Sequence, residues 1–341
     1  MTTPVTPRPP RRTITILAAL SAGAFLNVVS VQFAADAAPA AAPATATAPA
    51  AAPRGGAAAG PLTFTPSVAV PVPPAVAIPR PTPAEVEQLN AGLGRMIAQA
   101  DPATKSLLAK YPDVVAVRPP RANPAVVPSL NAGFRAKHMN NLEVAKQGTA
   151  ELLFMGDSIT DFWRNAGQPG VVNPPTAGKA VFDKYFGAMK VANFGISGDT
   201  TQGVLYRLLD GEGQGFQPKA IMLMIGTNNA AAASSAEIAE GVGAIVMEMR
   251  KDFPAAKILL LAIFPRGDPG SAIRKTVLDV NPIIAKLADN KNVFYLDIGA
   301  KFLDAEGNLP ADIMPDKLHP TEKGYEIWAQ AVIEPLKELM K

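Results

Sequence analysis

Five short apolar runs recur along the second half of the chain, and each is separated from the next by a stretch of helical length. The apolar runs cover residues 152–156, 191–195, 221–226, 258–264 and 293–297. The helical stretches cover residues 131–146, 201–209, 236–252, 274–288 and 321–340. Strands that are apolar throughout are buried on both faces, as happens in a parallel sheet covered by helices. The pattern therefore predicts a three-layer α/β/α sandwich with a five-stranded parallel sheet, and we expect the strand order 2-1-3-4-5.

Charge and cysteine content exclude several classes of protein. The net charge of +3 comes entirely from the first 60 residues, which hold four arginines and one aspartate, so the remaining chain is neutral. A neutral body lacks the basic face that nucleic-acid binding requires. Because the chain has no cysteine, disulfides, thiol catalysis, cysteine-bound zinc and a lipid anchor on cysteine are excluded. Only His138 and His319 are available for histidine chemistry.

The N-terminal 37 residues have the order of a secretory signal peptide. Three arginines precede an uncharged apolar stretch, and Ala35-Asp36-Ala37 offers a cleavage site between small residues. An uncleaved membrane anchor is the alternative, because the apolar stretch is long enough to span a bilayer. We expect cleavage, which predicts a secreted or periplasmic protein with no remaining membrane insertion.

The next two segments differ in composition from the main domain. Residues 38–81 are almost entirely Ala, Pro, Gly, Thr and Val, which predicts a disordered linker. Residues 82–130 form a helical and irregular extension, in which Thr82, Pro83 and Glu85 mark the start of a helix that continues to about residue 110. The main domain is then expected to cover residues 131–341.

Polar residues follow three of the predicted strands. Ser158 begins a helix directly after the first strand, where unpaired backbone N–H groups favour negative charge. Gly195 ends the second strand and lets the backbone approach a ligand closely. Asn228 follows the third strand and offers two side-chain donors. Ligands of open parallel sheets bind beyond the carboxyl ends of the strands, so these residues are candidates for one site.

An Asp-x-x-His sequence precedes the last helix. Asp316 is close enough along the chain to accept a hydrogen bond from Nδ1 of His319, which leaves Nε2 free to act as a base. Pro320 fits the first turn of the following helix. His138, in contrast, lies within a predicted helix, where we expect a structural or surface role.

Taken together, these sites resemble the SGNH (GDSL-type) hydrolase superfamily. Within it, residues 134–341 are similar to the catalytic subunits of platelet-activating-factor acetylhydrolase and their bacterial relatives. The resemblance is carried by LLFMGDSIT, NFGISGDTTQGVLYRL, MIGTNN, IFPRGDPGSAIR with Asn281 after it, and DKLHPTEKGY. One departure is Phe134, where related bacterial sequences often have tryptophan.

The resemblance implies a flavodoxin-like fold and ester hydrolysis without a cofactor or metal. It implies that Ser158 is the nucleophile, that His319 is the general base and that Asp316 orients it. The implied oxyanion hole consists of the amides of Ser158 and Gly195 and the side chain of Asn228. Residues 131–341 would then be the catalytic domain.

Three hypotheses about function follow. The first is a serine carboxylester hydrolase that removes short acyl groups, acetyl above all, from carbohydrate or other small esters through an acyl-enzyme. The second is a lysophospholipase or thioesterase with the same triad. The third is a binding protein that kept the fold without catalysis. The expected partner is an ester substrate, and the oligomeric state stays open.

Overall fold

The computed structural model describes residues 68–112 and 115–341. The expected signal peptide of residues 1–37 and the first part of the expected linker, residues 38–67, lie outside the described residues.

The centre of the main domain is a parallel sheet of five strands. These are β1 (Leu152–Gly156), β2 (Val191–Asn193), β3 (Ala220–Met224), β4 (Lys257–Leu261) and β5 (Val293–Leu296). Their order is β2-β1-β3-β4-β5, and every neighbouring pair is parallel. The three-layer prediction and the strand order 2-1-3-4-5 are confirmed. All residues of β1 and β3 are buried, as their continuous apolar sequences require.

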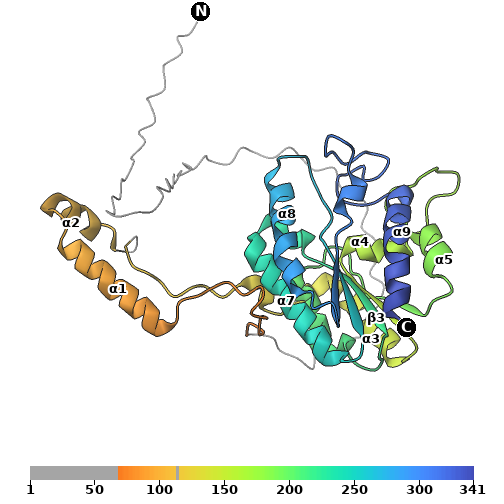
Figure 1. Ribbon diagram of the computed structural model, residues 1–341, viewed down its shortest axis with the longest axis horizontal. Coiled ribbons are helices and arrows are strands. Elements are labelled where there is room, and N and C mark those ends of the chain that lie inside the picture. The colour runs from red at the N-terminus through yellow and green to blue at the C-terminus, as the bar shows by residue number, and fades with distance from the viewer. Residues whose placement is uncertain (1–67, 113–114) are drawn as a thin grey trace, which may run out of the picture. The chain divides into compact units, whose positions relative to one another are not determined.

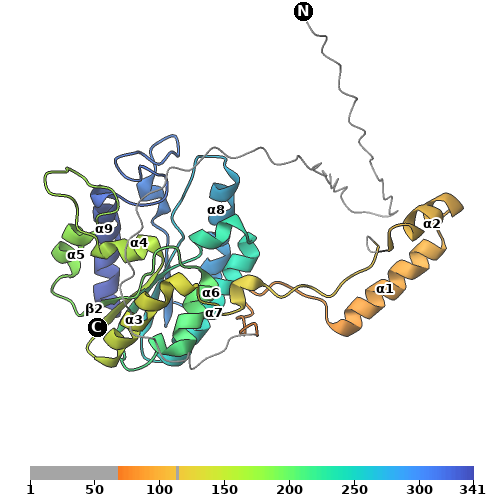
Figure 2. The same cartoon turned by 180° about the vertical axis from the view of Figure 1, so that it is seen from behind.

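Helices cover both faces of this sheet (Figures 1 and 2). One face carries α3 (Arg135–Lys146), α6 (Thr201–Arg207), α7 (Ser235–Asp252) and α8 (Ala272–Ile284). The other carries α4 (Ser158–Asp161), α5 (Lys179–Phe186) and α9 (Glu322–Leu339). The shorter helical turns are η2 (Pro124–Val126), η3 (Ala132–Phe134), η4 (Phe162–Arg164), η6 (Thr227–Ala231), η7 (Ala285–Leu287), η8 (Gly299–Phe302) and the π-helical η5 (Leu208–Glu212).

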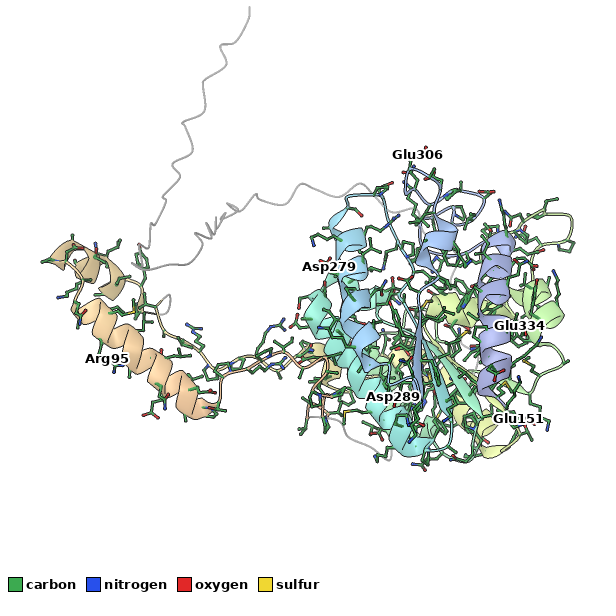
Figure 3. The ribbon with its side chains drawn as sticks, viewed as in Figure 1. Arg95, Glu151, Asp279, Asp289, Glu306 and Glu334 are labelled. Carbon is green, nitrogen blue, oxygen red and sulfur yellow. The ribbon has the colours of Figure 1, made fainter. Side chains whose placement is uncertain are left out.

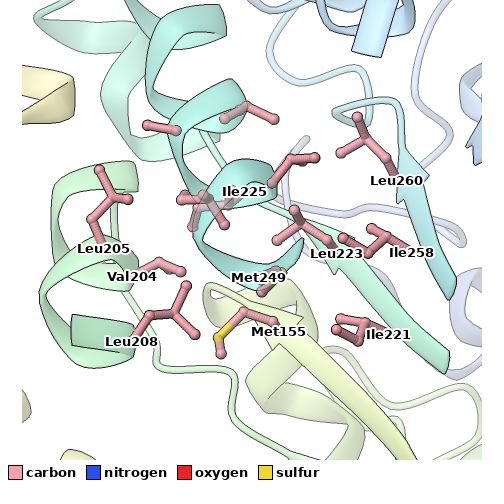
Figure 4. Packing of buried hydrophobic residues seen from close by; sticks show 14 of the residues in the cluster. Met155, Val204, Leu205, Leu208, Ile221, Leu223, Ile225, Met249, Ile258 and Leu260 are labelled. Carbon is pink, nitrogen blue, oxygen red and sulfur yellow. The ribbon is translucent and has the colours of Figure 1, made fainter. Parts of the chain in front are cut away.

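Alternate residues of the strands supply two separate cores. Ile221 and Leu223 of β3 belong to the core on the side of α6 and α7, where Figure 4 shows Leu223 beside Met249. Met222, between them in sequence, faces α9 on the opposite side of the sheet. Burying each large apolar side chain contributes about 1.5–3 kcal/mol to folding. The two cores fix the strands, and with them the strand ends at which polar residues lie.

The predicted helix of residues 82–110 is two helices in the structure. α1 (Pro83–Ala98) begins at the expected cap, because the side chain of Thr82 accepts from the amide of Glu85. α2 (Pro102–Ala109) begins anew after Asp101, whose carboxylate accepts from the amide of Thr104. Pro102 has no N–H with which to continue the first helix, so that helix ends before it and a new one begins.

Residues 70–80 pack on α7, although their composition predicted a linker up to residue 81. Val76 is 5% exposed and belongs to the core on that face. The amide of Val70 donates to Val126 O at 2.9 Å. The amide of Ile78 donates to Glu240 Oε1 at 2.8 Å, and Arg80 binds both oxygens of Glu240 at 2.6 Å. The main domain therefore begins before the expected boundaries at residues 82 and 131.

Charged side chains at the outside of the domain point into solvent. Figure 3 shows this for Glu306, in the loop after η8, and for Glu334 on α9. Within residues 68–112 and 115–341, no helix is both long enough and apolar enough to cross a membrane.

Candidate active site

Ser158 lies where the sheet and a helix meet, at the carboxyl end of β1. Asp157 is the N-cap of α4, and its Oδ1 accepts from the amide of Ile159 at 3.0 Å. Ser158 is 4% exposed, so the start of the helix holds its hydroxyl in a nearly buried position. Within the described residues its own amide has no backbone acceptor, as is usual for the first turn of a helix.

The structure brings Ser158, His319 and Asp316 together. Ser158 Oγ lies 2.9 Å from His319 Nε2, and His319 Nδ1 lies 2.6 Å from Asp316 Oδ2. The other oxygen of Asp316 accepts from the amide of His319 at 2.7 Å. Lys317, between them, has a φ of 58°, and this left-handed turn folds the three-residue segment back on itself.

Two neighbours set the surroundings of the histidine. Burial acts to raise the pKa of Asp316, but the hydrogen bonds from the amide and ring of His319 outweigh burial and lower that pKa. Asp316 is therefore held as a carboxylate. The ring of Phe162 lies 5.2 Å from that of His319 and limits how the imidazole can turn.

Asn228 lies in η6, directly after β3 and the left-handed Gly226, whose φ is 119°. One of its side-chain N–H groups donates to Asp199 O at 2.8 Å. The second N–H remains for a ligand. Asn228 is thus tied to the loop that follows β2.

Gly195 uses its amide differently from our expectation. Its N–H donates to Asn193 Oδ1 at 2.9 Å, so it is not free to bind an oxyanion. A Cβ at Gly195 would lie 2.4 Å from the amide nitrogen of Asp161, so this glycine is required for close packing against α4. Three residues later, Gly198 has a φ of 86°, and its amide has no acceptor among the described residues. Gly198 adjoins Asp199, to which Asn228 is bonded.

Two carboxylates and one side-chain amide that the sequence analysis did not identify hold the loop that follows β2. Asp161 accepts from the amide of Ser197 at 2.9 Å, and Lys137 pairs with the same oxygen. Asn193 donates to Thr160 O at 2.9 Å. Asp199 is completely buried, and its carboxylate binds Arg207. The only signal for these residues in the sequence was their position beside the motif glycines.

Asp157 is the most perturbed acid next to the site. Burial, with a smaller contribution from the charge of Asp199, raises its pKa to about 7. Arg266 acts in the opposite direction on that pKa, and its Nη1 donates to Thr227 O at 2.9 Å. No group of three or more acidic or histidine residues in the described part of the chain could hold a metal ion.

A hollow of about 500 Å³ adjoins the histidine loop. Its polar lining includes Arg164, Asn165, Gln168 and Thr176. The amide of Thr176 donates to the carbonyl of Pro320 at 3.0 Å, which joins this wall to the residue after His319.

The model of the GDSL-like lipase/acylhydrolase family matches residues 154–327, just over half of the chain. The chain belongs to the GDSL-like lipase/acylhydrolase family. The expected membership of the SGNH hydrolase superfamily is therefore confirmed, and with it a hydrolase family.

The GDSL-like match contains Ser158, Gly195, Asn228, Asp316 and His319 and ends within α9. The chain is similar to platelet-activating factor acetylhydrolase IB subunit alpha2 of Rattus norvegicus, with 33% identity over 57% of this chain and 78% of that protein. It is also similar to subunit alpha1 of the same organism, with 29% identity over 58% and 79% of the two chains.

Part of the chain is also similar to two solved structures. A GDSL-like lipase from Bacteroides thetaiotaomicron has a TM-score of 0.47 and 18% identity, covering 61% of this chain and 98% of that chain. An acetylxylan esterase from Geobacillus stearothermophilus has a TM-score of 0.42 and 24% identity, covering 57% and 96%.

Proposed function

We propose that this protein is a serine carboxylester hydrolase in which Ser158 is the nucleophile, His319 the general base and Asp316 its orienting partner. The supporting observation is the continuous contact from Ser158 Oγ through the imidazole to the carboxylate, at 2.9 and 2.6 Å. An imidazole between a hydroxyl and a carboxylate can take the hydroxyl proton at the moment of attack.

The proposed reaction proceeds through an acyl-enzyme. Ser158 Oγ attacks the ester carbonyl carbon while its proton moves to His319 Nε2. His319 then gives this proton to the leaving alcohol, and water attacks the acyl group on Ser158 with His319 again as base. Asp316 keeps Nδ1 protonated throughout.

The oxyanion is held by three donors in this proposal. They are the amides of Ser158 and Gly198 and the second side-chain N–H of Asn228. We assign Gly198 in place of Gly195 because the amide of Gly195 is occupied by Asn193. Each such donor can stabilise the transition state by about 3–4 kcal/mol.

We propose a short acyl group, acetyl above all, on a small polar alcohol such as a carbohydrate. The name of the acetylhydrolase relatives supports acetyl as the acyl group. The hollow whose wall is joined through Thr176 to Pro320 supports a polar alcohol, because a guanidinium, two amides and a hydroxyl line it. Side chains of these types bind hydroxyl groups by hydrogen bonds.

The deciding experiment is hydrolysis of p-nitrophenyl acetate by purified protein, with Ser158→Ala as its control. Wild-type turnover that is lost in the folded variant supports the proposal. Turnover that survives in Ser158→Ala excludes Ser158 as nucleophile, and no turnover in wild type favours a binding protein with this fold.

The acyl chain is tested by a series of p-nitrophenyl esters from C2 to C16. We expect kcat/KM to fall at least about tenfold between acetyl and octanoyl esters, since each methylene that a pocket cannot accept costs about 1–3 kcal/mol. An optimum at C8 or longer would favour a lysophospholipase or thioesterase instead.

We also propose that the enzyme acts outside the cytoplasm, on the strength of the N-terminal 37 residues. N-terminal sequencing of the mature protein tests this. A new N-terminus near residue 38 supports export with cleavage, and an intact Met1 contradicts cleavage.

A further inference from the structure

His138 lies between two carboxylates in the interior of the domain. Its side chain is completely buried on α3, with Nδ1 2.8 Å from Glu212 Oε1 and Nε2 2.8 Å from Asp210 Oδ2. A carboxylate can only accept, so both contacts are hydrogen bonds only if both ring nitrogens carry protons. The geometry thus fits an imidazolium.

An unusual turn makes this arrangement possible. Residues two apart on an ordinary α-helix do not face the same neighbour. Here Asp210 and Glu212 lie at a kink in η5, where Asp210 and Gly211 depart from helical dihedral angles and Gly211 has a φ of 109°. The kink brings both carboxylates to one imidazole.

The other charged and polar groups around His138 belong to α6 and α3. Arg207 of α6 opposes its protonation, while the ring of Tyr206 lies edge-on at 6.1 Å. On α3 itself, Asn141 donates to Glu212 Oε1 at 3.1 Å, and Arg135 acts on Tyr206. Burial acts to lower the pKa of His138, but the hydrogen bonds to Glu212 and Asp210 outweigh burial and raise it.

From Glu212 a chain of buried charges leads to the proposed oxyanion hole. The second oxygen of Glu212 binds Arg207 Nη1. Arg207 in turn donates from Nε and Nη2 to Asp199 Oδ2, at 3.0 and 2.8 Å. Glu212, Arg207 and Asp199 are all completely buried, so water does not screen these contacts.

Asp199 connects this chain of charges to the backbone of the loop that follows β2. Its Oδ1 accepts from the amide of Thr200 at 2.8 Å, and its carbonyl accepts from the side chain of Asn228 at 2.8 Å. A Cβ at Gly203 would lie 1.9 Å from Asp199 Oδ1, so only glycine there leaves room for the carboxylate. Movement of Asp199 would displace both Gly198 and Asn228.

We propose that His138 is a positioning residue of this esterase: its protonated ring holds Glu212 and, through Arg207 and Asp199, aims the amide of Gly198 and the side chain of Asn228 at the oxyanion. This inference rests on the proposed function. Loss of one ring proton leaves one of the two carboxylates facing a nitrogen lone pair and weakens the hold of the ring on Glu212. The oxyanion donors then lose alignment, which lowers kcat more than it raises KM.

The sign of the pH dependence follows from the raised pKa. A group whose pKa is raised on folding stabilises the folded arrangement through its proton. This stabilisation is complete below the pKa of the unfolded state, about 6.5 for histidine, and is lost as pH rises through the pKa of the folded state. We therefore expect kcat to fall at alkaline pH as His138 loses its proton.

The test measures kcat and KM for p-nitrophenyl acetate from pH 6 to 10, with spontaneous hydrolysis subtracted, in wild type and three variants. His138→Gln should lower kcat about tenfold at neutral pH with little change in KM, a smaller loss than removing a whole oxyanion donor. Its kcat should lack the alkaline decrease. Asp210→Asn, which keeps the Glu212–Arg207–Asp199 chain, should move that decrease to lower pH.

Asn141→Ala is the matched control, because Asn141 donates to the same oxygen of Glu212 but does not titrate. It should keep the alkaline decrease at the wild-type pH. A kcat of His138→Gln within twofold of wild type, or a decrease that Asp210→Asn leaves unmoved, would overturn the inference. If His138→Gln does not fold, Asp210→Asn alone decides. Wild type without Ser158-dependent hydrolysis would overturn both proposals, so the two failures are distinguishable.

Discussion

Asn228 has two side-chain N–H groups, and Asp199 O occupies one of them. If the other binds the oxyanion, Asn228→Ala removes an interaction that forms mainly in the transition state. We expect kcat to fall by about 10²–10³ with little change in KM. Steady-state kinetics on p-nitrophenyl acetate measure this, and a change in KM alone would mean that Asn228 binds the substrate instead.

Ionisation of the buried carboxyl group of Asp157, next to Ser158, should make the stability of the fold depend on pH. Burial raises its pKa to about 7, well above the ordinary value of 3.8, so the folded state binds this proton more tightly than the unfolded state. Stability should therefore decrease as pH rises from about 4 to about 7. Asp157→Asn keeps the acceptor for the amide of Ile159 and removes the charge.

We expect the Tm advantage of Asp157→Asn over wild type to be about 5 °C larger at pH 8 than at pH 5, because most of the loss in wild type falls between these two values. Thermal unfolding at the two pH values measures this difference. Asp157→Ala is the control, since it lacks the cap acceptor and should have a lower Tm at pH 5. An equal Tm difference between Asn and wild type at the two pH values would contradict the raised pKa.

Two of the ion pairs made by residues of helix α7 differ in burial. Glu240 is 1% exposed and binds Arg80, whereas Arg121 is 65% exposed and binds Glu237. Removing Arg80 leaves a buried carboxylate without its cation, which should lower the free energy of unfolding by about 3 kcal/mol. Arg121→Ala should cost at most about 1 kcal/mol. Urea unfolding compares the two variants, and similar losses would show that burial does not distinguish the pairs.

The elements that the sequence predicted well are those whose burial on both faces produces a continuous run of apolar residues. All five strands were predicted within three residues at each end, because apolar runs flanked by turns have few other structures. The helix α5 was missed, since it has eight residues and no side-chain cap. The kink in η5, at the end of α6, was also missed, because this segment packs on α3 and its shape does not follow from local preference.

The candidate site separates in the same way. The motifs predicted Ser158, Asp316 and His319, whose contacts depend on a strand end and one tight turn. The amide of Gly195 could not be predicted, because its partner is a side chain two residues earlier that turns back on the loop. Nor could the contacts of His138 be predicted, because they depend on a kink in η5 that lies far from it along the chain.

The extent of the folded domain determines how much of the chain the enzyme needs. Composition suggested that a chain starting near residue 81 would suffice, since alanine and proline bury little apolar area. The valines among those prolines change this. Val76 fits against Gly243, where a Cβ would lie 2.5 Å from its methyl group, and Arg80 neutralises Glu240.

We therefore expect a chain of residues 68–341 to keep the Tm and the esterase activity of the full chain, and a chain of residues 82–341 to lose stability. The shorter chain lacks Val76, worth about 1.5–3 kcal/mol of burial, and the cation of a buried ion pair, worth about 3 kcal/mol. Together these losses should lower Tm by about 10 °C. Thermal unfolding of both chains at equal concentration measures the difference, and Arg80→Ala in the longer chain separates the ion pair from the apolar contact. Equal Tm values for the two chains would restore the later boundary, and would mean that residues 70–80 lie on α7 without stabilising it.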